Sequence, residues 1–434
     1  MKLNWFSPLP PEQTDIAHYT ARIAAALMRR FDVTFWTDLA ADPKALPPEA
    51  KVRVFDPAKM TGRKFNGPLF NGLNVYNIGN DARFHRGIVQ VARKIPGLAI
   101  LHDTRLHHLV FESARNNERP FSSYIDLARE IYGPGGEAKA QKIVMAEGRT
   151  IDEHVDDMPF VEAFLENAIG ALCHSKLASD DLRRCSTAPV LTLPLPFTSL
   201  ARPPETHRQW SAPWRFVMFG YVNPNRRLEN ILQALATWRD APDFHFDVFG
   251  SLWNRPLIEK RIAESGLKAR VTIHGFVPER QLDKAIASAH LAFNLRYPSM
   301  GEASGGILRS WAHATPALVT NTGWYADLPD EVARKLSVDE EIADIHKALN
   351  ELVASPERYE QTGVAARNRL ETLHSPDAYA SALAAALENL PRLMTRFASR
   401  RLMLNVAMNA KSREERSPLL QVASERIPDL FIGA

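Results

Sequence analysis

Residues 294–323 read NLRYPSMGEASGGILRSWAHATPALVTNTG and decide how the second half of the chain is interpreted. The pattern predicts a strand before a Tyr-Pro turn, a helix after Gly305-Gly306 and a further strand at 317–320. Glycines at a helix start let backbone N–H groups approach a phosphate, and the helix N-terminus adds about half a positive charge. Glu302 can accept several hydroxyl hydrogen bonds. The stretch therefore indicates a phosphate beside a sugar, with an ordinary strand–turn–helix crossover as the alternative.

Short apolar runs alternate with amphipathic segments on both sides of this stretch. In the first half they include LNWFS (3–7), LAILHD (98–103) and IGALCHS (169–175), and in the second half RFVMFG (215–220). Runs of this length are typical of parallel strands that helices cover on both faces. The predicted fold class is therefore α/β, with two doubly wound, Rossmann-like domains that face a central cleft.

The domain boundaries follow from chain length and from proline content. A chain of 434 residues suits two domains rather than one core, and a Pro-rich stretch without periodicity separates the two alternations. We expect an N-terminal domain at 1–196, a linker at 197–213, a C-terminal domain at 214–375, and helices at 376–434 that pack back on the N-terminal domain.

Composition narrows the class of protein. The hydrophobic content of 45% and the charged content of 24% are typical of soluble globular proteins. A formal net charge of +3 is too small to indicate nucleic acid as a partner. Cys173 and Cys185 suit neither a zinc site nor a disulfide framework, so a reducing cytoplasm fits best. Residues 1–6 are predicted to be a first strand rather than a secretory signal, and no apolar run is long enough to span a membrane.

The C-terminal tail is basic. Residues 391–416 contain seven Lys or Arg residues and two Glu residues. Such a segment could lie peripherally on the anionic inner face of a membrane, at roughly 1 kcal/mol per basic residue. The alternative is a terminal helix that packs on the protein.

Common catalytic motifs are missing from the sequence. The pairs Asp156-Asp157 and Asp180-Asp181 have polar helical surroundings and are predicted to be solvated. The sequence contains no Asp-x-Asp, the usual motif for a diphosphate-bound divalent metal, and no P-loop, G-x-S-x-G or metal-spaced His/Cys cluster. No metal site is expected.

Candidate binding residues gather at strand ends of the second half. Gly220 ends one strand, and Arg226 and Arg227 precede the next helix, where a bound diphosphate would explain two basic side chains. Phe276 and Val277 follow another strand, where exposed backbone could bind the edge of a nucleotide base. A surface Arg pair and a plain turn are the respective alternatives.

In the first half, His102 and Asp103 end a strand that faces the expected cleft. His102 could hold a sugar hydroxyl or orient a reacting group, and a buried structural histidine is the alternative. His107 and His108 are expected to be structural.

Together these residues resemble the retaining glycosyltransferases of family 4 (group 1), which have the GT-B fold. The resemblance covers most of residues 1–390. It is strongest over 216–329, in FGYVNPNRRLENILQAL, VTIHGFVPERQL and YPSMGEASGGILRSWAHATPALVTNTGWYADLP. It implies retaining transfer of a hexose-type sugar from a nucleotide-diphosphate donor, a UDP- or GDP-sugar, to an acceptor hydroxyl. The implied acceptor is a glycan or glycolipid, as in bacterial surface polysaccharide or glycoconjugate synthesis.

The resemblance also implies residue roles. Arg226 corresponds to a basic residue on the donor diphosphate, Glu302 to the first carboxylate of a Glu-x7-Glu motif on the sugar hydroxyls, and His102 to a histidine near the transferred sugar. These three are the expected catalytic residues, and neither a metal nor a cofactor other than the donor is expected. The expected donor-binding residues are Gly220, Tyr221, Arg226, Arg227, Phe276, Val277, Glu302, Ser304, Gly305, Gly306 and Ser310.

Three positions depart from the family pattern. Ser310 replaces the second Glu of the motif, and Tyr221 replaces a basic diphosphate residue, for which Arg227 is expected to compensate. Asp15 stands where glycine is common. Two alternatives stay open: a catalytically weak GT-B scaffold or partner subunit, and a soluble enzyme that glycosylates a small sugar phosphate.

Overall fold

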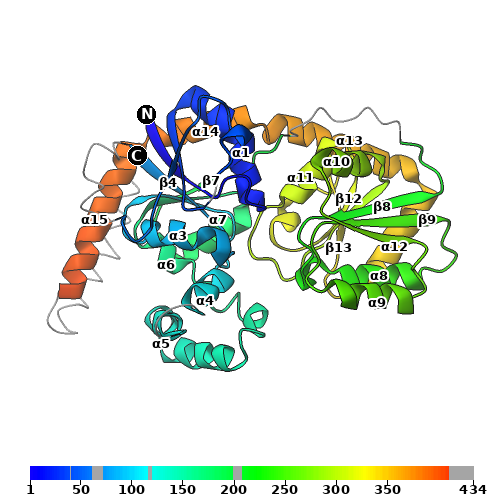
Figure 1. Ribbon diagram of the computed structural model, residues 1–434, viewed down its shortest axis with the longest axis horizontal. Coiled ribbons are helices and arrows are strands. Elements are labelled where there is room, and N and C mark those ends of the chain that lie inside the picture. Colours follow the sequence, from blue (N-terminus) through cyan, green and yellow to red (C-terminus); the bar gives the residue numbers. More distant parts are fainter. Residues whose placement is uncertain (40, 61–71, 116–119, 199–207, 410–434) are drawn as a thin grey trace.

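The computed structural model describes residues 1–39, 41–60, 72–115, 120–198 and 208–409, which form two parallel sheets (Figure 1). The seven-stranded N-terminal sheet has the order β3-β2-β1-β4-β5-β6-β7, and the six-stranded C-terminal sheet has the order β10-β9-β8-β11-β12-β13. In each sheet the first three strands follow one another in one direction, and the later strands are added on the other side of the first strand. This change of direction is typical of doubly wound folds. The prediction of an α/β protein with two Rossmann-like domains is confirmed.

In the N-terminal domain, every residue of three neighbouring strands, β4, β5 and β6, is buried. Such burial is expected of a parallel sheet that helices cover on both faces. The strands are β1 (Lys2–Phe6), β2 (Asp32–Thr37), β3 (Lys51–Val54), β4 (Leu73–Ile78), β5 (Gly97–Leu101), β6 (Ala168–Cys173) and β7 (Val190–Thr192). The helices are α1 (Asp15–Arg30), α3 (Ala82–Ala92), α4 (His107–Arg115), α5 (Ser122–Met145), α6 (Glu162–Leu165) and α7 (Lys176–Cys185).

The C-terminal domain repeats this architecture on the right of Figure 1. Its strands are β8 (Trp214–Phe219), β9 (Phe244–Phe249), β10 (Val271–Gly275), β11 (Leu291–Asn294), β12 (Ala317–Thr320) and β13 (Arg334–Leu336). Its helices are α8 (Leu228–Thr237), α9 (Arg255–Glu264), α10 (Glu279–Ser288), α11 (Gly305–Ala312), α12 (Glu341–Ala354) and α13 (Pro356–Leu373). Within the opening stretch 294–323, the strand–turn–helix–strand order is the one that the sequence predicted.

After α13 the chain returns to the N-terminal domain. Helix α14 (Pro376–Leu387) packs on α1, where the Tyr19 hydroxyl donates to the Tyr379 hydroxyl at 2.8 Å. The return is tied to the start of the expected linker, because the Phe197 N–H donates to the His374 carbonyl at 2.7 Å. Most of that linker, residues 199–207, lies outside the described residues.

Helix α15 (Leu390–Asn409) carries the first part of the basic tail and packs on β6 (Figure 1). Arg400 donates to the carbonyls of Glu166 at 3.2 Å and Ala168 at 2.5 Å, and Leu393 is buried. These contacts favour the packed-helix alternative for this part of the tail, and residues 410–434 lie outside the described residues. Among the helices that the structure describes, none is both long and apolar enough to cross a membrane.

Candidate functional site

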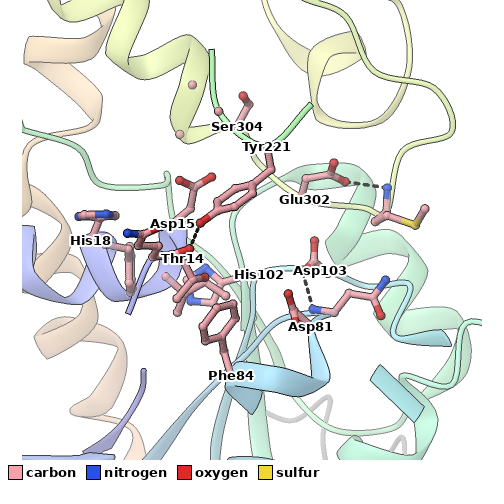
Figure 2. A pocket seen from close by; sticks show the side chains of 18 of the residues that line it. Thr14, Asp15, His18, Asp81, Phe84, His102, Asp103, Tyr221, Glu302 and Ser304 are labelled. Carbon is pink, nitrogen blue, oxygen red and sulfur yellow. Dashed lines mark hydrogen bonds between the residues drawn. The ribbon is translucent and has the colours of Figure 1, made fainter. Parts of the chain in front are cut away.

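A cavity of about 1510 Å³ lies between the two domains, at the carboxyl ends of both sheets. Residues of both domains line it, as the predicted cleft requires (Figure 2). The labelled residues from the N-terminal domain are Thr14, Asp15, His18, Asp81, Phe84, His102 and Asp103, and those from the C-terminal domain are Tyr221, Glu302 and Ser304.

Glu302 lines the cavity from the loop between β11 and α11, and its carboxylate is held on both oxygens. Oε1 forms an ion pair with Arg296, and Oε2 accepts from the Met300 N–H at 2.7 Å and from the Ser299 hydroxyl at 3.2 Å. These contacts fix the direction of the carboxylate before any ligand binds. Arg296 also lines the cavity. It was not predicted, although a basic residue two positions after a buried strand was a signal.

Asp103, at the end of β5, lies near Glu302 on the other side of the cavity (Figure 2). Burial, and then the negative charge of Glu302, raise the pKa of Asp103 to about 7. A hydrogen bond of 2.7 Å from the Asn80 N–H to Oδ2 opposes this rise. The result is a pair of carboxyl groups from different domains, of which one holds its proton close to neutral pH.

The predicted phosphate turn forms the N-terminus of α11. The Ser304 hydroxyl accepts from the Ile307 N–H at 3.3 Å and caps the helix. A Cβ at Gly305 would meet nothing within 4 Å, whereas a Cβ at Gly306 would lie 3.0 Å from Asn294 Oδ1. All three turn residues line the cavity, so its wall contains an open, positively polarised helix end.

Arg226 lines the same cavity from the 3₁₀ helix η4 (Pro224–Arg226). It is buried, and the one hydrogen bond that its guanidinium forms among the described residues is a long one of 3.5 Å to the Phe219 carbonyl. Burial, and then the charge of Arg296, lower the pKa of Arg226 to about 10, so the guanidinium stays charged at neutral pH. A buried cation without a carboxylate partner is costly, and an anionic ligand would remove that cost.

Arg227, which was predicted to bind the donor, contacts α12. Its Nε lies 2.9 Å from Glu341 Oε2 on α12, and it does not line the cavity. Residue 227 has φ of +60°, which turns the chain into α8 and directs its side chain toward α12. Glu341 also accepts from Asn230 at 2.6 Å. Arg227 is therefore part of the contact between α8 and α12.

Ser310, which was also predicted to bind the donor, does not line the cavity. Ser310 is fully buried on α11, and its hydroxyl donates to the Gly306 carbonyl at 3.3 Å, so the short side chain stays inside the helix packing. Besides Glu302, a second carboxylate of the C-terminal domain lines the cavity. It belongs to Glu279, at the start of α10. Its Oε1 lies 3.5 Å from Arg309 and 3.7 Å from Arg22. The signal that could have found it was an acid two residues after the predicted turn at 276–277.

Tyr221 spans the cavity at the end of β8. Its hydroxyl donates to the Gln13 carbonyl in the N-terminal domain (Figure 2). Its ring packs edge-on against Phe276 at a centroid distance of 5.7 Å, and Phe276 is 57% exposed. Gly220 and Val277 line the same wall. An aromatic surface therefore occupies the place where a basic residue was expected.

His102 lines the floor of the cavity, as predicted. Its Nε2 lies 3.1 Å from Asn77 Oδ1, and its ring packs edge-on against Tyr19 at 4.7 Å. Burial, and then the neighbouring His174, hold the pKa of His102 well below its usual range. His102 is therefore neutral at pH 7. Within the described ranges, no group of three or more His, Cys, Asp or Glu side chains is arranged to hold a metal ion.

Comparison with known proteins agrees with this geometry. Residues 205–369 match the family model for glycosyl transferases group 1. Sucrose-phosphate synthase from Thermosynechococcus elongatus is similar in structure, with 16% identity, a TM-score of 0.62 and coverage of 90% of this chain and 99% of that chain. HepE from Anabaena, in complex with UDP, has 13% identity, a TM-score of 0.61 and coverage of 90% and 100%.

WaaG, a glycosyltransferase involved in lipopolysaccharide biosynthesis, has 14% identity, a TM-score of 0.57 and coverage of 88% and 98%. No curated protein sequence matches the chain. The structural similarities confirm the GT-B fold, and the family match confirms the prediction of a glycosyltransferase.

Proposed function

We propose that this glycosyltransferase moves a hexose-type sugar from a nucleotide-diphosphate donor to an acceptor hydroxyl, with retention of configuration, as in family 4. One observation carries the proposal. Arg226, a buried cation without an ion-pair partner among the described residues, lines the same cavity as the glycine turn of α11 and the oriented carboxylate of Glu302. A diphosphate fits the first two features and a sugar fits the third.

In this arrangement the diphosphate lies between Arg226 and the N-terminus of α11, and the sugar lies against Glu302. The base lies beside Phe276 and Val277, and Glu279 takes the ribose contact that Ser310 does not reach. A UDP-sugar is the first donor to test, because the structures of HepE were solved with UDP and with UDP-glucose. A GDP-sugar is the second.

The proposed reaction needs no protein nucleophile. The bond between the sugar C1 and the phosphate oxygen breaks while the acceptor oxygen attacks C1 from the same face, and the departing phosphate oxygen takes the acceptor proton. Arg226 and the amides of α11 stabilise the charge on the diphosphate, and loss of one such contact costs about 3 kcal/mol. Glu302 and the neutral His102 position the sugar.

The N-terminal wall of the cavity favours an unphosphorylated acceptor. Its arginines already have partners: Arg83 pairs with Asp81 at 2.6 Å, Arg86 donates to the Glu112 carbonyl at 2.9 Å, and Arg22 faces Glu279. Besides Asp103, the acidic residues of this wall are Asp15, Asp38, Asp81, Glu112 and Asp152. Carboxylates accept hydrogen bonds from sugar hydroxyls and repel phosphate. We therefore favour a glycan or glycolipid acceptor over a sugar phosphate.

The proposed location is the cytoplasm. Cys173 and Cys185 are free thiols, as in a reducing compartment. Peripheral contact with the membrane through the basic tail stays a proposal, and co-sedimentation of the protein with anionic vesicles, with and without residues 391–434, tests it.

A thermal-shift panel of UDP-, GDP- and ADP-sugars tests the function. A bound donor at 100 times its Kd stabilises the protein by about 2.7 kcal/mol, which raises the melting temperature measurably. The selected donor is then assayed for transfer to neutral oligosaccharides and to sugar phosphates. Absence of any nucleotide-dependent shift would contradict the enzymatic proposal and favour the scaffold alternative.

A further inference from the structure

The loop that carries Glu302 is hydrogen-bonded to the N-terminal domain through Met300. The backbone N–H groups of Thr104 and Arg105 both donate to the Met300 carbonyl, at 2.9 and 3.0 Å. The Met300 N–H in turn donates to Glu302 Oε2 at 2.7 Å. We call Thr104, Arg105 and Met300 the clasp. It connects the end of β5 in one domain to the sugar-facing carboxylate in the other.

The clasp fits closely. Gly301 follows Met300 with φ of +81°, and a Cβ there would lie 1.9 Å from Thr104 Oγ1. Thr104 is almost fully buried. The loop can therefore rest on Thr104 only because residue 301 is glycine, and a small shift of Thr104 would move the loop with it.

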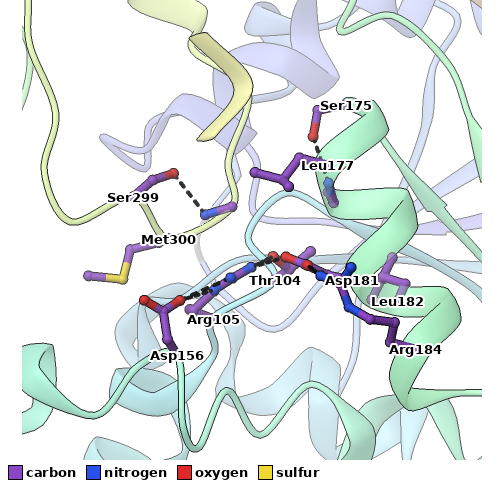
Figure 3. Close-up of polar contacts among 12 residues, drawn as sticks. Thr104, Arg105, Asp156, Ser175, Leu177, Asp181, Leu182, Arg184, Ser299 and Met300 are labelled. Carbon is purple, nitrogen blue, oxygen red and sulfur yellow. Dashed lines mark hydrogen bonds and ion pairs between the residues drawn. The ribbon is translucent and has the colours of Figure 1, made fainter. Parts of the chain in front are cut away.

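Arg105 holds its own end of the clasp in place (Figure 3). Its Nη1 forms an ion pair with Asp181 and donates to Thr104 Oγ1 at 2.9 Å, and its Nε donates to Asp156 Oδ1 at 3.0 Å. The Arg105 and Asp181 side chains are only 18% and 15% exposed. Asp181 is therefore not the solvated residue that the sequence predicted, whereas Asp156, 74% exposed, remains near solvent.

Arg105 itself does not line the cavity, so any effect on the reaction must pass through the clasp. We propose that Arg105 is a positioning residue for sugar transfer, which fixes the Thr104 and Arg105 amides and thereby directs Glu302 toward the donor sugar. The inference rests on the proposed function for the role of Glu302. A misplacement of the reacting groups by about 1 Å can cost roughly 100-fold in rate, so a loosened clasp would lower kcat without changing the nucleotide contacts.

The chain offers a matched control. Arg184 forms an ion pair with the same Asp181 but is 70% exposed, and among the described residues its recorded partner is Asp181 alone. Arg184→Ala removes a cation from the same carboxylate and leaves the clasp intact. Arg105→Lys keeps the charge but loses the forked contact with Asp181, Asp156 and Thr104.

The first experiment is amide hydrogen exchange on the full-length protein without ligand. In Arg105→Ala, the amides of residues 104 and 105 and the segment 300–302 should exchange faster than in the wild type, whereas Arg184→Ala should match the wild type. Equal exchange in the two variants overturns the proposal. If Arg105→Ala does not fold, Asp181→Asn and Arg105→Lys are measured instead, with the same expected order.

The second experiment measures kinetics with the nucleotide sugar that the thermal-shift panel selects, and binding of the free nucleotide by calorimetry. For Arg105→Ala we expect kcat to fall roughly 10- to 100-fold, with nucleotide affinity unchanged and partial recovery in Arg105→Lys. A merely structural role would lower stability and leave kcat of the folded fraction unchanged, which overturns the proposal. If the wild type binds no nucleotide sugar, the proposed function fails, but the exchange experiment still decides whether the clasp depends on Arg105.

Discussion

Arg296 and Glu302 form an ion pair on the wall of the cavity, with side chains that are only 18% and 10% exposed. The guanidinium and the carboxylate come from the two ends of one short loop, between β11 and α11. Burial lowers the pKa of the Arg296 guanidinium, but the nearby Glu302 carboxylate raises it by more. The pKa of Arg296 is therefore higher than usual. The charge of Arg296 is therefore stabilised by Glu302, and the ion pair joins two parts of the loop where the sugar is proposed to bind.

This dependence predicts an asymmetry between single and double substitutions. Arg296→Met leaves Glu302 partly buried and unpaired, and should destabilise the protein by about 3 kcal/mol, because breaking a buried pair costs more than replacing it. The double variant Arg296→Met/Glu302→Gln should recover part of this loss. Urea unfolding at pH 7 measures both free energies. A double variant less stable than Arg296→Met would contradict the assigned pairing.

Asp103 predicts how stability depends on pH. The unfolded chain releases this proton near pH 3.8, whereas the folded protein keeps it up to about pH 7. Between these values the folded state binds more protons than the unfolded state, so this residue lowers the free energy of unfolding as pH rises. Asp103→Asn should therefore gain stability relative to the wild type as pH rises from 5 to 8. Melting temperatures over this range test the sign, and a constant difference between the two proteins would refute it.

The sequence was sufficient to predict the fold and the position of several residues that line the cavity. The glycine turn after β11, the strand-end His102 and the buried Arg226 lie where the spacing predicted them, because strand ends and helix starts position them directly. Two other predicted residues do not line the cavity, because their side chains point elsewhere. Ser310 points into the packing of α11, and Arg227 takes a left-handed conformation that no local pattern signalled.

Partners that are distant in the sequence could not be predicted from spacing. Asp181 was expected to be solvated, but it pairs with Arg105, and the clasp then joins residue 105 to residue 300. Glu279 and Arg22 approach each other only because the two domains close on one another. The pair of Arg105 and Asp181 depends on the folding of the N-terminal domain, and the other two contacts depend on the arrangement of the domains. The pattern of apolar residues encodes neither.

The neighbouring arginines 226 and 227 provide a matched pair for the diphosphate assignment. Arg226→Ala should lower the transfer rate roughly 100-fold, the cost of one lost charged contact with the leaving group. Arg227→Ala should leave kcat unchanged and lower stability, because it breaks the pair with Glu341. Initial rates with the selected donor, corrected for the folded fraction, distinguish the two. Similar rate losses in both variants would show that the diphosphate does not lie at Arg226.

Glu279 and Ser310 provide the corresponding pair for the ribose contact. Glu279→Gln keeps the size of the side chain but weakens hydroxyl binding, and should reduce nucleotide affinity about tenfold, equivalent to about 1.4 kcal/mol. Ser310→Ala should leave affinity unchanged, because its hydroxyl bonds to the Gly306 carbonyl and not to the cavity. Calorimetric titration with UDP and GDP measures both. If Ser310→Ala weakened binding while Glu279→Gln did not, the ribose would have to lie against α11, and the assignment of Glu279 would fail.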